Sequence, residues 1–277
     1  MPELPEVETV ARQIRRLYLG GSLKQVSAQQ SIIFQNIAAS QFAASLQGKR
    51  LLEVNRYGKF LYWKVEDVYP VFHLGMSGIF IREKSRSLYP QHIHISFQFE
   101  DGATLFFQDI RKFSKISLFN EPPKFPQLGI DVSGEKFTLN NLKKLLNLTN
   151  VTTKSLLMDQ RRMAGIGNIY ASEILFDARI HPTRPAGSLT DGEIQRLYQS
   201  VHKIIQKAIE RFGTTYTAYL TVEGTPGENQ NFLKVYQKNG EPCPVCGETI
   251  EKIVLNSRST FFCKKCQKKK IKKRRST

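Results

Sequence analysis

The stretch Ile93-His94-Ile95-Ser96-Phe97-Gln98-Phe99 decides the fold class of the region around it, because apolar and polar residues alternate strictly along it. A period of two is typical of a β-strand with one face on a core and the other toward solvent. Asp101-Gly102 follows, and then Thr104-Leu105-Phe106-Phe107. An Asp-Gly pair between two such runs is a strong hairpin signal. Antiparallel β-structure is therefore predicted here.

The residues on either side of this hairpin extend the prediction. Between residues 51 and 119 apolar and polar residues alternate repeatedly, as at Phe60 and Tyr62. We therefore predict an antiparallel β domain built as a sandwich or flattened barrel. Ahead of it, residues 5–19 carry apolar side chains at helical spacing and stop at Gly20-Gly21. This pattern predicts an amphipathic helix with one buried face.

The second half of the chain has a different, helical character. Three prolines and a glycine between residues 122 and 129 break the β pattern and are interpreted as a linker. Further on, Thr190-Asp191-Gly192-Glu193 has the form of a capping box, and the helix that follows is predicted to run to Gly213. Residues 214–230 are polar and rich in Thr and Gly, so they are predicted to form a mobile loop.

Together these patterns predict an α+β fold of more than one domain for the 277-residue chain. An N-terminal helix and an antiparallel β-sandwich come first, then a helical domain and a small cysteine-containing module. The predicted parts are an N-terminal β domain (1–120), a linker (121–134), a helical domain (135–232), a four-cysteine module (233–267) and a basic tail (268–277).

All four cysteines of the chain lie close together near its C-terminal end. They form two CxxC pairs, each of which presents two thiolates to one tetrahedral metal ion. The residues between the pairs can form the hairpin that brings them together, whereas disulfides are disfavoured in a chain without an export signal. Four cysteine ligands leave no open coordination position, so the sequence predicts one structural zinc ion, held by Cys243, Cys246, Cys263 and Cys266.

The charge balance of the chain points to an anionic partner. Lys and Arg number 41 against 24 Asp and Glu, which gives a formal charge of +17. Nucleic acid is the commonest partner of such a surplus. A membrane surface is the alternative, but we find no lipidation signal and no apolar run near the ~18 residues that a spanning helix requires. The acidic start is also unlike a signal peptide, so we expect a soluble, cytoplasmic protein without membrane contact.

Two segments have features suited to nucleic acid. Residues 158–170 are predicted to form helix, glycine turn and helix, and the second helix would offer free N–H groups and Asn168 to a phosphate. An ordinary tight turn explains this pattern equally well. Arg111-Lys112-Phe113 follows a predicted strand, and there an arginine and an aromatic ring can act as a wedge in a base stack, with Met76 as a second apolar wedge. Each of these residues taken alone is equally compatible with packing.

Lys59, His92 and His94 are polar residues of predicted strands. Lys59 is expected to open a strand, and the two histidines alternate onto one face. Without further evidence we interpret all three as ordinary polar strand positions.

The first six residues, Met1-Pro2-Glu3-Leu4-Pro5-Glu6, allow two interpretations. Removal of Met1 would leave Pro2 as a free secondary amine, and amines attack sugar or carbonyl carbons to form imines. Glu3 would then lie beside the amine as a proton donor or acceptor. Alternatively, proline at the entry of a helix and acids in its first turn are ordinary capping chemistry.

Taken together, these motifs resemble the formamidopyrimidine-DNA glycosylase family over nearly the whole chain. The most specific matches are the first eight residues, residues 73–78, residues 165–173 and the four-cysteine module. Leu4 favours this branch over the related endonuclease VIII branch, which typically has glycine there. The resemblance implies a DNA repair enzyme that excises oxidised purines, notably 8-oxoguanine and formamidopyrimidines, and then nicks the strand by β,δ-elimination. It also implies double-stranded DNA with such lesions or abasic sites as partner, one structural zinc ion, and a monomer.

The resemblance further implies a role for individual residues. Pro2 would be the nucleophile, Glu3 the general acid, and Glu6 a supporting residue of the same pocket. Lys59 would transfer protons and bind phosphate, and Arg258 would clamp phosphate during the second elimination. The residues implied in DNA contact are His92, Arg111, Lys154 and Asn168, and those that would fill the void of the extruded base are Met76, Arg111 and Phe113.

Some positions depart from the family pattern. Ile110 stands where the family often has Pro or Ala, and Ser114 stands where Gly is usual. Both changes are expected to alter the geometry of the wedge. Near Thr149 the family can carry a DNA-binding lysine, which this chain lacks, and Lys143 and Lys144 are expected to compensate for it. Glu228 lies in the segment that corresponds to the lesion-capping loop, so the preference between 8-oxoguanine and formamidopyrimidine stays open. The basic tail has seven Lys and Arg and no acid, and we expect it to add nonspecific DNA affinity.

Three rival functions remain for comparison. The first is an inactive relative that binds damaged DNA without cutting it, which the joint presence of Pro2, Glu3 and Lys59 disfavours. The second is an endonuclease VIII-like enzyme for oxidised pyrimidines, which Leu4 and the Arg111–Phe113 pair disfavour. The third is a ribosome- or RNA-associated zinc-ribbon protein, which charge and cysteines alone do not exclude but which the first residues, with Pro2 and Glu3, disfavour.

Overall fold

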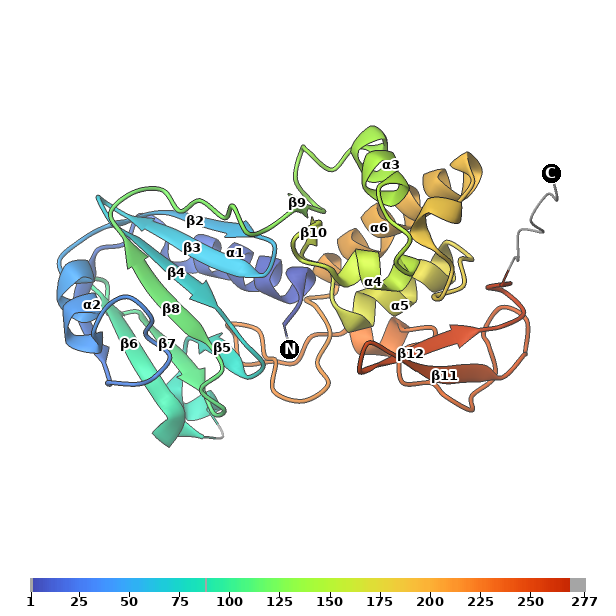
Figure 1. Cartoon of the computed structure of the whole chain (residues 1–277). Helices are drawn as coiled ribbons and strands as arrows, with labels where there is room; N and C mark the ends of the chain where they lie inside the picture. Colours follow the sequence, from blue (N-terminus) through green and yellow to red (C-terminus); the bar gives the residue numbers. More distant parts are fainter. Residues whose placement is uncertain (1, 88, 270–277) are drawn as a thin grey trace. The chain divides into compact units, whose positions relative to one another are not determined.

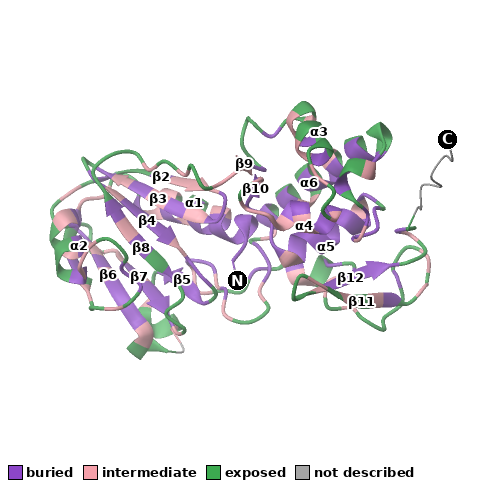
Figure 2. Cartoon of the chain, in the orientation of Figure 1, coloured by how far each residue is buried: buried purple, intermediate pink, exposed green. Residues whose placement is uncertain are grey.

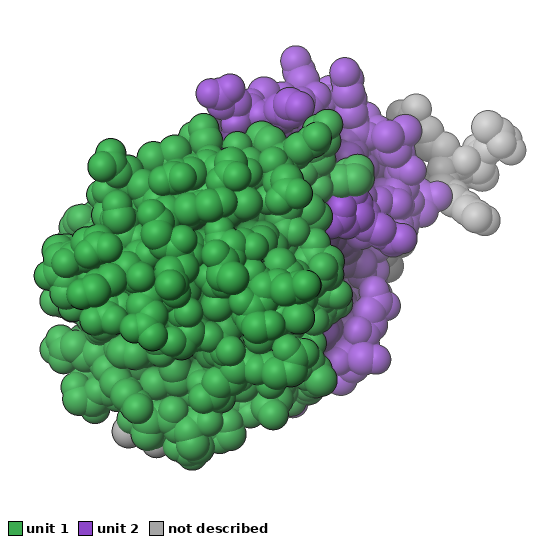
Figure 3. All heavy atoms as spheres, turned by 90° about the vertical axis from the view of Figure 1, so that its left-hand side faces the viewer, with its two compact units in different colours: residues 1–126, 208–231 green, residues 127–207, 232–277 purple. Residues whose placement is uncertain are grey.

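The structure is a computed structural model that describes residues 2–87 and 89–269. The chain divides into two compact units, coloured separately in Figure 3. The first comprises residues 1–126 and 208–231, and the second comprises residues 127–207 and 232–277. This division differs from the predicted domains, because the segment 208–231 belongs to the first unit rather than to the helical part. Most of the predicted basic tail lies outside the described residues.

The first unit contains helices α1 and α2 and two four-stranded sheets (Figure 1). Its sheets have the strand orders β1-β6-β7-β5 and β2-β3-β4-β8, and every pair of neighbouring strands is antiparallel. The elements are α1 (Leu4–Tyr18), β1 (Leu23–Ala28), α2 (Ala39–Leu46), β2 (Leu51–Tyr57), β3 (Phe60–Val65), β4 (Tyr69–His73), β5 (Gly78–Ile81), β6 (Ile93–Phe99), β7 (Thr104–Asp109) and β8 (Lys115–Phe119).

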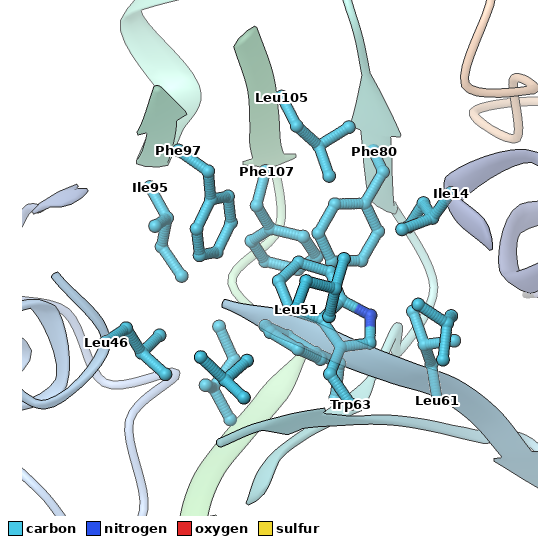
Figure 4. Close-up of a cluster of buried hydrophobic side chains, with 14 of the residues drawn as sticks. Ile14, Leu46, Leu51, Leu61, Trp63, Phe80, Ile95, Phe97, Leu105 and Phe107 are labelled. Carbon is cyan, nitrogen blue, oxygen red and sulfur yellow. The ribbon is translucent and has the colours of Figure 1, made fainter. Parts of the chain in front are cut away.

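Aromatic side chains from both sheets meet in one core (Figure 4). The ring of Trp63 on β3 lies 5.1 Å from that of Phe97 on β6 and 5.6 Å from that of Phe80 on β5, measured between centroids. Phe72 on β4 likewise contacts Phe107 on β7. Buried aromatic rings at these separations contribute both apolar area and favourable ring geometry. The predicted antiparallel sandwich is therefore confirmed.

Helix α1 covers one part of this core and confirms the predicted amphipathic helix. Val7, Val10, Ala11 and Ile14 are fully buried in the core cluster, whereas Arg12 is exposed. The alternation at the start of β6 is more irregular than predicted. A register shift lies between Ile93 and Ile95, and the preceding residue His92 ends a short 3₁₀ turn instead of belonging to the strand.

The segment after α6 is not the free loop that its composition suggested. Tyr219 and Val222 are buried in the core of the first unit. The backbone of Val222 donates to the side chain of Gln13 and accepts from the N–H of Arg82, at 2.8 and 2.9 Å. The polar composition of this segment therefore concealed two apolar residues that anchor its middle part to the core.

The second unit is mainly helical and ends in a β-hairpin. Its helix α5 is buried over almost its whole length (Figure 2). The capping box before α6 is confirmed, since the Glu193 carboxylate accepts from the Thr190 N–H at 2.9 Å. None of the helices within the described ranges is both long and apolar enough to cross a bilayer. The elements are β9 (Ile130–Asp131), α3 (Leu139–Asn147), α4 (Thr153–Met158), β10 (Met163–Ala164), α5 (Asn168–Asp177), most of α6 (Asp191–Glu210), β11 (Ile250–Leu255) and β12 (Arg258–Cys263).

Candidate functional site

The N-terminal end of α1 brings three of the predicted site residues together. Pro2, Glu3 and Glu6 are all buried, and Glu3 has the extended backbone of an N-cap residue. The Glu6 carboxylate accepts from the Glu3 N–H at 2.7 Å, which satisfies one of the free donors of the first turn. Capping chemistry is thus present, and it orders the same residues that the catalytic interpretation requires.

Glu6 also connects this end of the helix to the segment that follows α6. Its second carboxylate oxygen accepts from the Thr214 N–H at 2.8 Å. Gly213 has φ of +79°, and a Cβ there would lie 2.9 Å from the Glu6 side chain. Burial, and then the nearby Glu6 carboxylate, raise the pKa of Tyr219 well above its usual value. This buried, neutral tyrosine was not predicted, because its neighbourhood depends on a contact distant in sequence.

Lys59 lies in the two-residue turn between β2 and β3, not in the strand as predicted. Tyr57 pairs with Phe60, and Gly58 has φ of +57°, which suits the first central position of a type II′ turn. The side chain is buried, with an exposed fraction of 6%, so Lys59 is not an ordinary polar strand position. A buried lysine beside a functional group is a common source of acid–base chemistry.

His73, at the end of β4, is a neighbour of Lys59 that the sequence analysis did not single out. Burial, and then the positive charges of Lys59 and Lys115, lower the pKa of His73 to about 4. The Gly75 N–H donates to His73 Nδ1 at 3.2 Å, so the neutral ring carries its proton on Nε2. The only hint in the sequence was its place at the start of the motif 73–78.

The predicted wedge residues lie on two loops of the first unit. Met76 lies in the turn between β4 and β5, and 39% of it is exposed; Phe113 lies between β7 and β8, and 51% of it is exposed. The guanidinium of Arg111 lies 4.6 Å from the centre of the Phe113 ring, a cation–π distance. Arg111 and Phe113 therefore lie together, although Lys112 between them has φ of +54° rather than an extended backbone.

The two histidines occupy different environments, contrary to the prediction that they share one face. His94 is buried, and its Nε2 lies 3.0 Å from the carbonyl oxygen of Asp109. His92 is half-buried and lies 6.2 Å from the ring of Tyr89. They belong to different elements, because His92 ends the 3₁₀ turn before β6 and His94 lies within the strand.

A second group of predicted residues meets in the second unit. Asn168 is the first residue of α5, and its amide donates to the carbonyl of Ser259 at 3.0 Å. Lys154 was predicted to face DNA, but only 1% of it is exposed. Its ammonium donates to Asn168 Oδ1 at 2.7 Å, to Thr260 Oγ1 at 2.6 Å and to the Ser259 carbonyl at 3.1 Å. The lysine thus joins the helical part to the hairpin.

Arg258 lies at the tip of that hairpin, where Asn256 and Ser257 both have positive φ, as a type I′ turn requires. It is exposed and lines an open pocket of about 600 Å³. Cations and amides that line a concave surface suit an anion such as phosphate. The lining residues include Asn168, Tyr236, Lys252, Arg258 and Ser259.

Glu173 on α5 holds one wall of this pocket, and the sequence analysis missed it. Its buried carboxylate accepts from the backbone N–H groups of Lys234, Val235 and Tyr236 at 2.8 to 2.9 Å. Burial raises the pKa of Glu173, while these three hydrogen bonds oppose the rise. The segment that leads into the cysteine module is thereby attached to α5.

The four cysteines have the geometry of one tetrahedral site. Their sulfur atoms all lie within 4.8 Å of one another, with Cys243 and Cys266 at 3.9 Å and Cys246 and Cys263 at 3.5 Å. Four sulfurs at ~2.3 Å from a central zinc ion would be about 3.8 Å apart, so the set suits one structural zinc ion. When bound, the ion would hold the β11–β12 hairpin closed.

The chain was compared with known families and proteins. The family model of the formamidopyrimidine-DNA glycosylase N-terminal domain matches residues 1–116, and that of the H2TH domain of the same enzyme matches residues 128–219. The model of the zinc finger found in FPG and IleRS matches residues 240–269. The three models follow one another along the chain in the same order as the elements described above.

Individual proteins agree with the family models. Formamidopyrimidine-DNA glycosylase of Lactobacillus delbrueckii subsp. bulgaricus is 37% identical over 274 residues, covering 97% of this chain and 100% of the relative. Formamidopyrimidine-DNA glycosylase of Listeria innocua serovar 6a is 38% identical over 273 residues, which cover 97% of this chain and 100% of the relative.

Solved structures give the same result. The MutM (Fpg) protein of Thermus thermophilus has a TM-score of 0.84 and 39% identity, with 96% of this chain and 98% of that one covered. Lactococcus lactis Fpg in complex with abasic-site DNA has a TM-score of 0.87 and 32% identity. The match covers 96% of this chain and 100% of the Lactococcus lactis chain. The chain therefore belongs to the formamidopyrimidine-DNA glycosylase family.

Proposed function

We propose that this protein is a base-excision DNA repair enzyme, a DNA glycosylase that removes oxidised purines and then nicks the strand as an abasic-site lyase. Its relative from Lactococcus lactis has been solved with DNA that contains an abasic site, and a mutant of that relative has been solved with DNA that contains Fapy-dG. The observation that carries the proposal is the buried cluster of Pro2, Glu3 and Glu6 at the head of α1.

The first chemical step would use this cluster. After loss of Met1, the Pro2 nitrogen would attack C1′ of the extruded nucleotide and lose its proton, while the electron pair of the glycosidic bond would leave with the base, which takes up a proton. Glu3 would donate a proton to the sugar ring oxygen, so that the C1′–O bond breaks, the ring opens and a positively charged imine (an iminium ion) forms between Pro2 and C1′. Glu6 would keep Glu3 and the backbone of Thr214 in place through its two hydrogen bonds.

The imine would then serve as an electron sink for strand cleavage. Loss of a proton from C2′ would expel the 3′ phosphate, and a second elimination would expel the 5′ phosphate. Lys59 is proposed to transfer protons in these steps, and the neutral His73 beside it can accept or donate one. Arg258 is proposed to hold a phosphate in the pocket of the second unit. Water would finally release Pro2 by hydrolysis of the imine.

The DNA would be opened and held by the remaining predicted residues. Extrusion of a base costs a few kcal/mol, and wedge side chains offset part of that cost by filling the gap. Met76, Arg111 and Phe113 are proposed as this wedge. His92 and Asn168 are proposed to contact DNA, and Lys154 is proposed to support them through Asn168 and the hairpin.

Borohydride trapping tests the proposal. The N-terminally processed protein is incubated with a duplex that carries 8-oxoguanine opposite cytosine, and the imine is reduced to a stable adduct. Pro2→Gly should abolish the adduct, whereas Pro5→Ala, a matched change in the same turn, should retain it. A processed protein that binds the duplex tightly without forming an adduct would favour the inactive damage-binding rival.

A parallel substrate comparison decides between the purine and pyrimidine functions. The Lactococcus lactis relative has also been solved with an oxidised pyrimidine, which makes the comparison necessary. The same protein is incubated with 8-oxoguanine, formamidopyrimidine and oxidised-pyrimidine duplexes, and the initial rates are compared. Faster excision of the pyrimidine would overturn the assignment to purines.

A further inference from the structure

Asp109, the last residue of β7, is a fully buried carboxylate for which the proposed chemistry has no use. It accepts three hydrogen bonds: from Ser77 Oγ at 2.5 Å, from the Arg111 N–H at 3.2 Å and from the Ser114 N–H at 2.8 Å. A buried carboxylate is costly unless such donors surround it. These donors come from two different loops, and those are the loops that carry Met76 and the Arg111–Phe113 pair.

Ser114 makes a second connection between the same loops. Its hydroxyl is buried and donates to the carbonyl oxygen of Leu74 at 3.0 Å. The Ser77 hydroxyl, which donates to Asp109, also accepts from the Arg111 N–H at 3.1 Å. The Ser114 side chain therefore adds a contact between the loops.

Two glycines show how closely the loops approach. A Cβ on Gly75 would lie 2.4 Å from the carbonyl oxygen of Phe113, and one on Gly78 would lie 2.3 Å from Ser114 Oγ. No Cβ fits at either distance, so Gly75 lies directly against the backbone of Phe113, and Gly78 lies directly against the Ser114 side chain. Gly75 also has φ of +60°, a conformation that favours glycine.

We propose that Asp109, Ser77 and Ser114 form a brace that joins the two loops into one rigid support for the wedge residues. The brace is buried, whereas Met76 and Phe113 above it are exposed. Side chains already held in position lose less conformational freedom when they enter a base stack. Ser114 and Asp109 are then positioning residues for base extrusion. This inference rests on the proposed function, because it deepens the role of the wedge.

The brace predicts a selective defect in opening DNA. Ser114→Ala should lower kcat/KM for excision of 8-oxoguanine about fivefold, the effect of one hydrogen bond, and Asp109→Asn should lower it at least about thirtyfold. Lyase activity on a preformed abasic site should change less than about twofold, because no base has to be unstacked. Ser117→Ala, on the adjoining strand β8, is the matched control and should leave both activities unchanged.

A measurement that needs no chemistry accompanies the kinetics. A duplex that carries an uncleavable 8-oxoguanine nucleotide with 2-aminopurine beside it reports insertion of the wedge by stopped-flow fluorescence, and in this duplex the base still has to be extruded. Insertion should be about fivefold slower in Ser114→Ala than in the wild-type protein. Equal insertion rates would overturn the brace, as would equal losses of excision and lyase activity. A wild-type protein that inserts the wedge but excises nothing would instead refute the proposed function, while the insertion rates would still test the brace.

Discussion

Replacement of Lys154 by methionine tests whether this lysine contacts DNA or organises the protein. Its ammonium donates to Asn168, Ser259 and Thr260 at 2.6 to 3.1 Å, and 1% of the residue is exposed. Methionine has a similar length and fills the space of the aliphatic stem, so the change mainly removes the three hydrogen bonds.

The loss of stability can be worked out from these contacts. A hydrogen bond to a charged group contributes about 1.5 to 3 kcal/mol, and acceptors left buried without a donor add a penalty. Because the desolvation cost of the ammonium disappears as well, we expect a net loss of about 3 kcal/mol. At roughly 3 °C per kcal/mol, the transition of the second unit should move down by about 10 °C. Differential scanning calorimetry measures this shift.

The dependence of DNA binding on salt gives the decisive comparison. Removal of a cation that contacts a phosphate lowers the slope of log K against log salt by about 0.9. Lys154→Met should weaken binding through misplacement of Asn168 and the hairpin, yet keep the wild-type slope. Arg258→Met, which removes an exposed cation of the pocket, should lower the slope by about 1. Fluorescence anisotropy on uncleavable duplex DNA supplies both values.

The opposite pattern would refute this reasoning. If Lys154→Met lowered the salt slope by about 1 and left the melting temperature within about 2 °C of the wild-type value, the lysine would be a phosphate contact. The hydrogen bonds that surround it would then be irrelevant to its function.

Three other predictions concern charge, anchoring and metal. Burial, and then Lys59 and Lys115, lower the pKa of His73 to about 4, so the unfolded chain binds this proton first as the pH falls. The free energy of unfolding should therefore drop by about 2 kcal/mol between about pH 7.5 and pH 5, a dependence that His73→Gln should remove, as measured by urea denaturation. Glu173→Gln turns an acceptor into a donor that faces backbone N–H groups, so it should cost about 2 kcal/mol and speed amide exchange at residues 234–236. Removal of zinc by a chelator should open the β11–β12 hairpin and abolish DNA binding, yet leave the fluorescence of Trp63 unchanged, because the single tryptophan lies in the core of the first unit.

Each of these has a clear contrary result. A pH dependence that persists in His73→Gln would assign it to another group. Unchanged amide exchange in Glu173→Gln would show that its carboxylate does not anchor the segment. Full DNA binding by the metal-free protein would separate the hairpin from the interface.

Local patterns in the sequence predicted the parts of the fold that depend on neighbouring residues. Alternation and the Asp101-Gly102 turn predicted the β6–β7 hairpin, helical spacing predicted α1, and the two CxxC pairs predicted the metal site. These features need no knowledge of distant residues, because a strand, a helix and a two-residue turn are specified within a few positions. The same local reasoning misplaced His92 and Lys59, because each lies in a turn next to its expected strand.

By itself, then, the sequence determined the family, the order of the elements and the residues that could carry chemistry. Only the tertiary structure decided what those side chains contact. Glu6 meets Thr214 across 208 positions, Lys154 meets Thr260 across 106, and Ser77 meets Asp109 across 32. Such partners depend on which buried donors and acceptors the packed core leaves for one another, since a buried polar group must find a partner wherever the fold provides one. A local pattern in the sequence does not show which distant residue will become the partner of a given side chain.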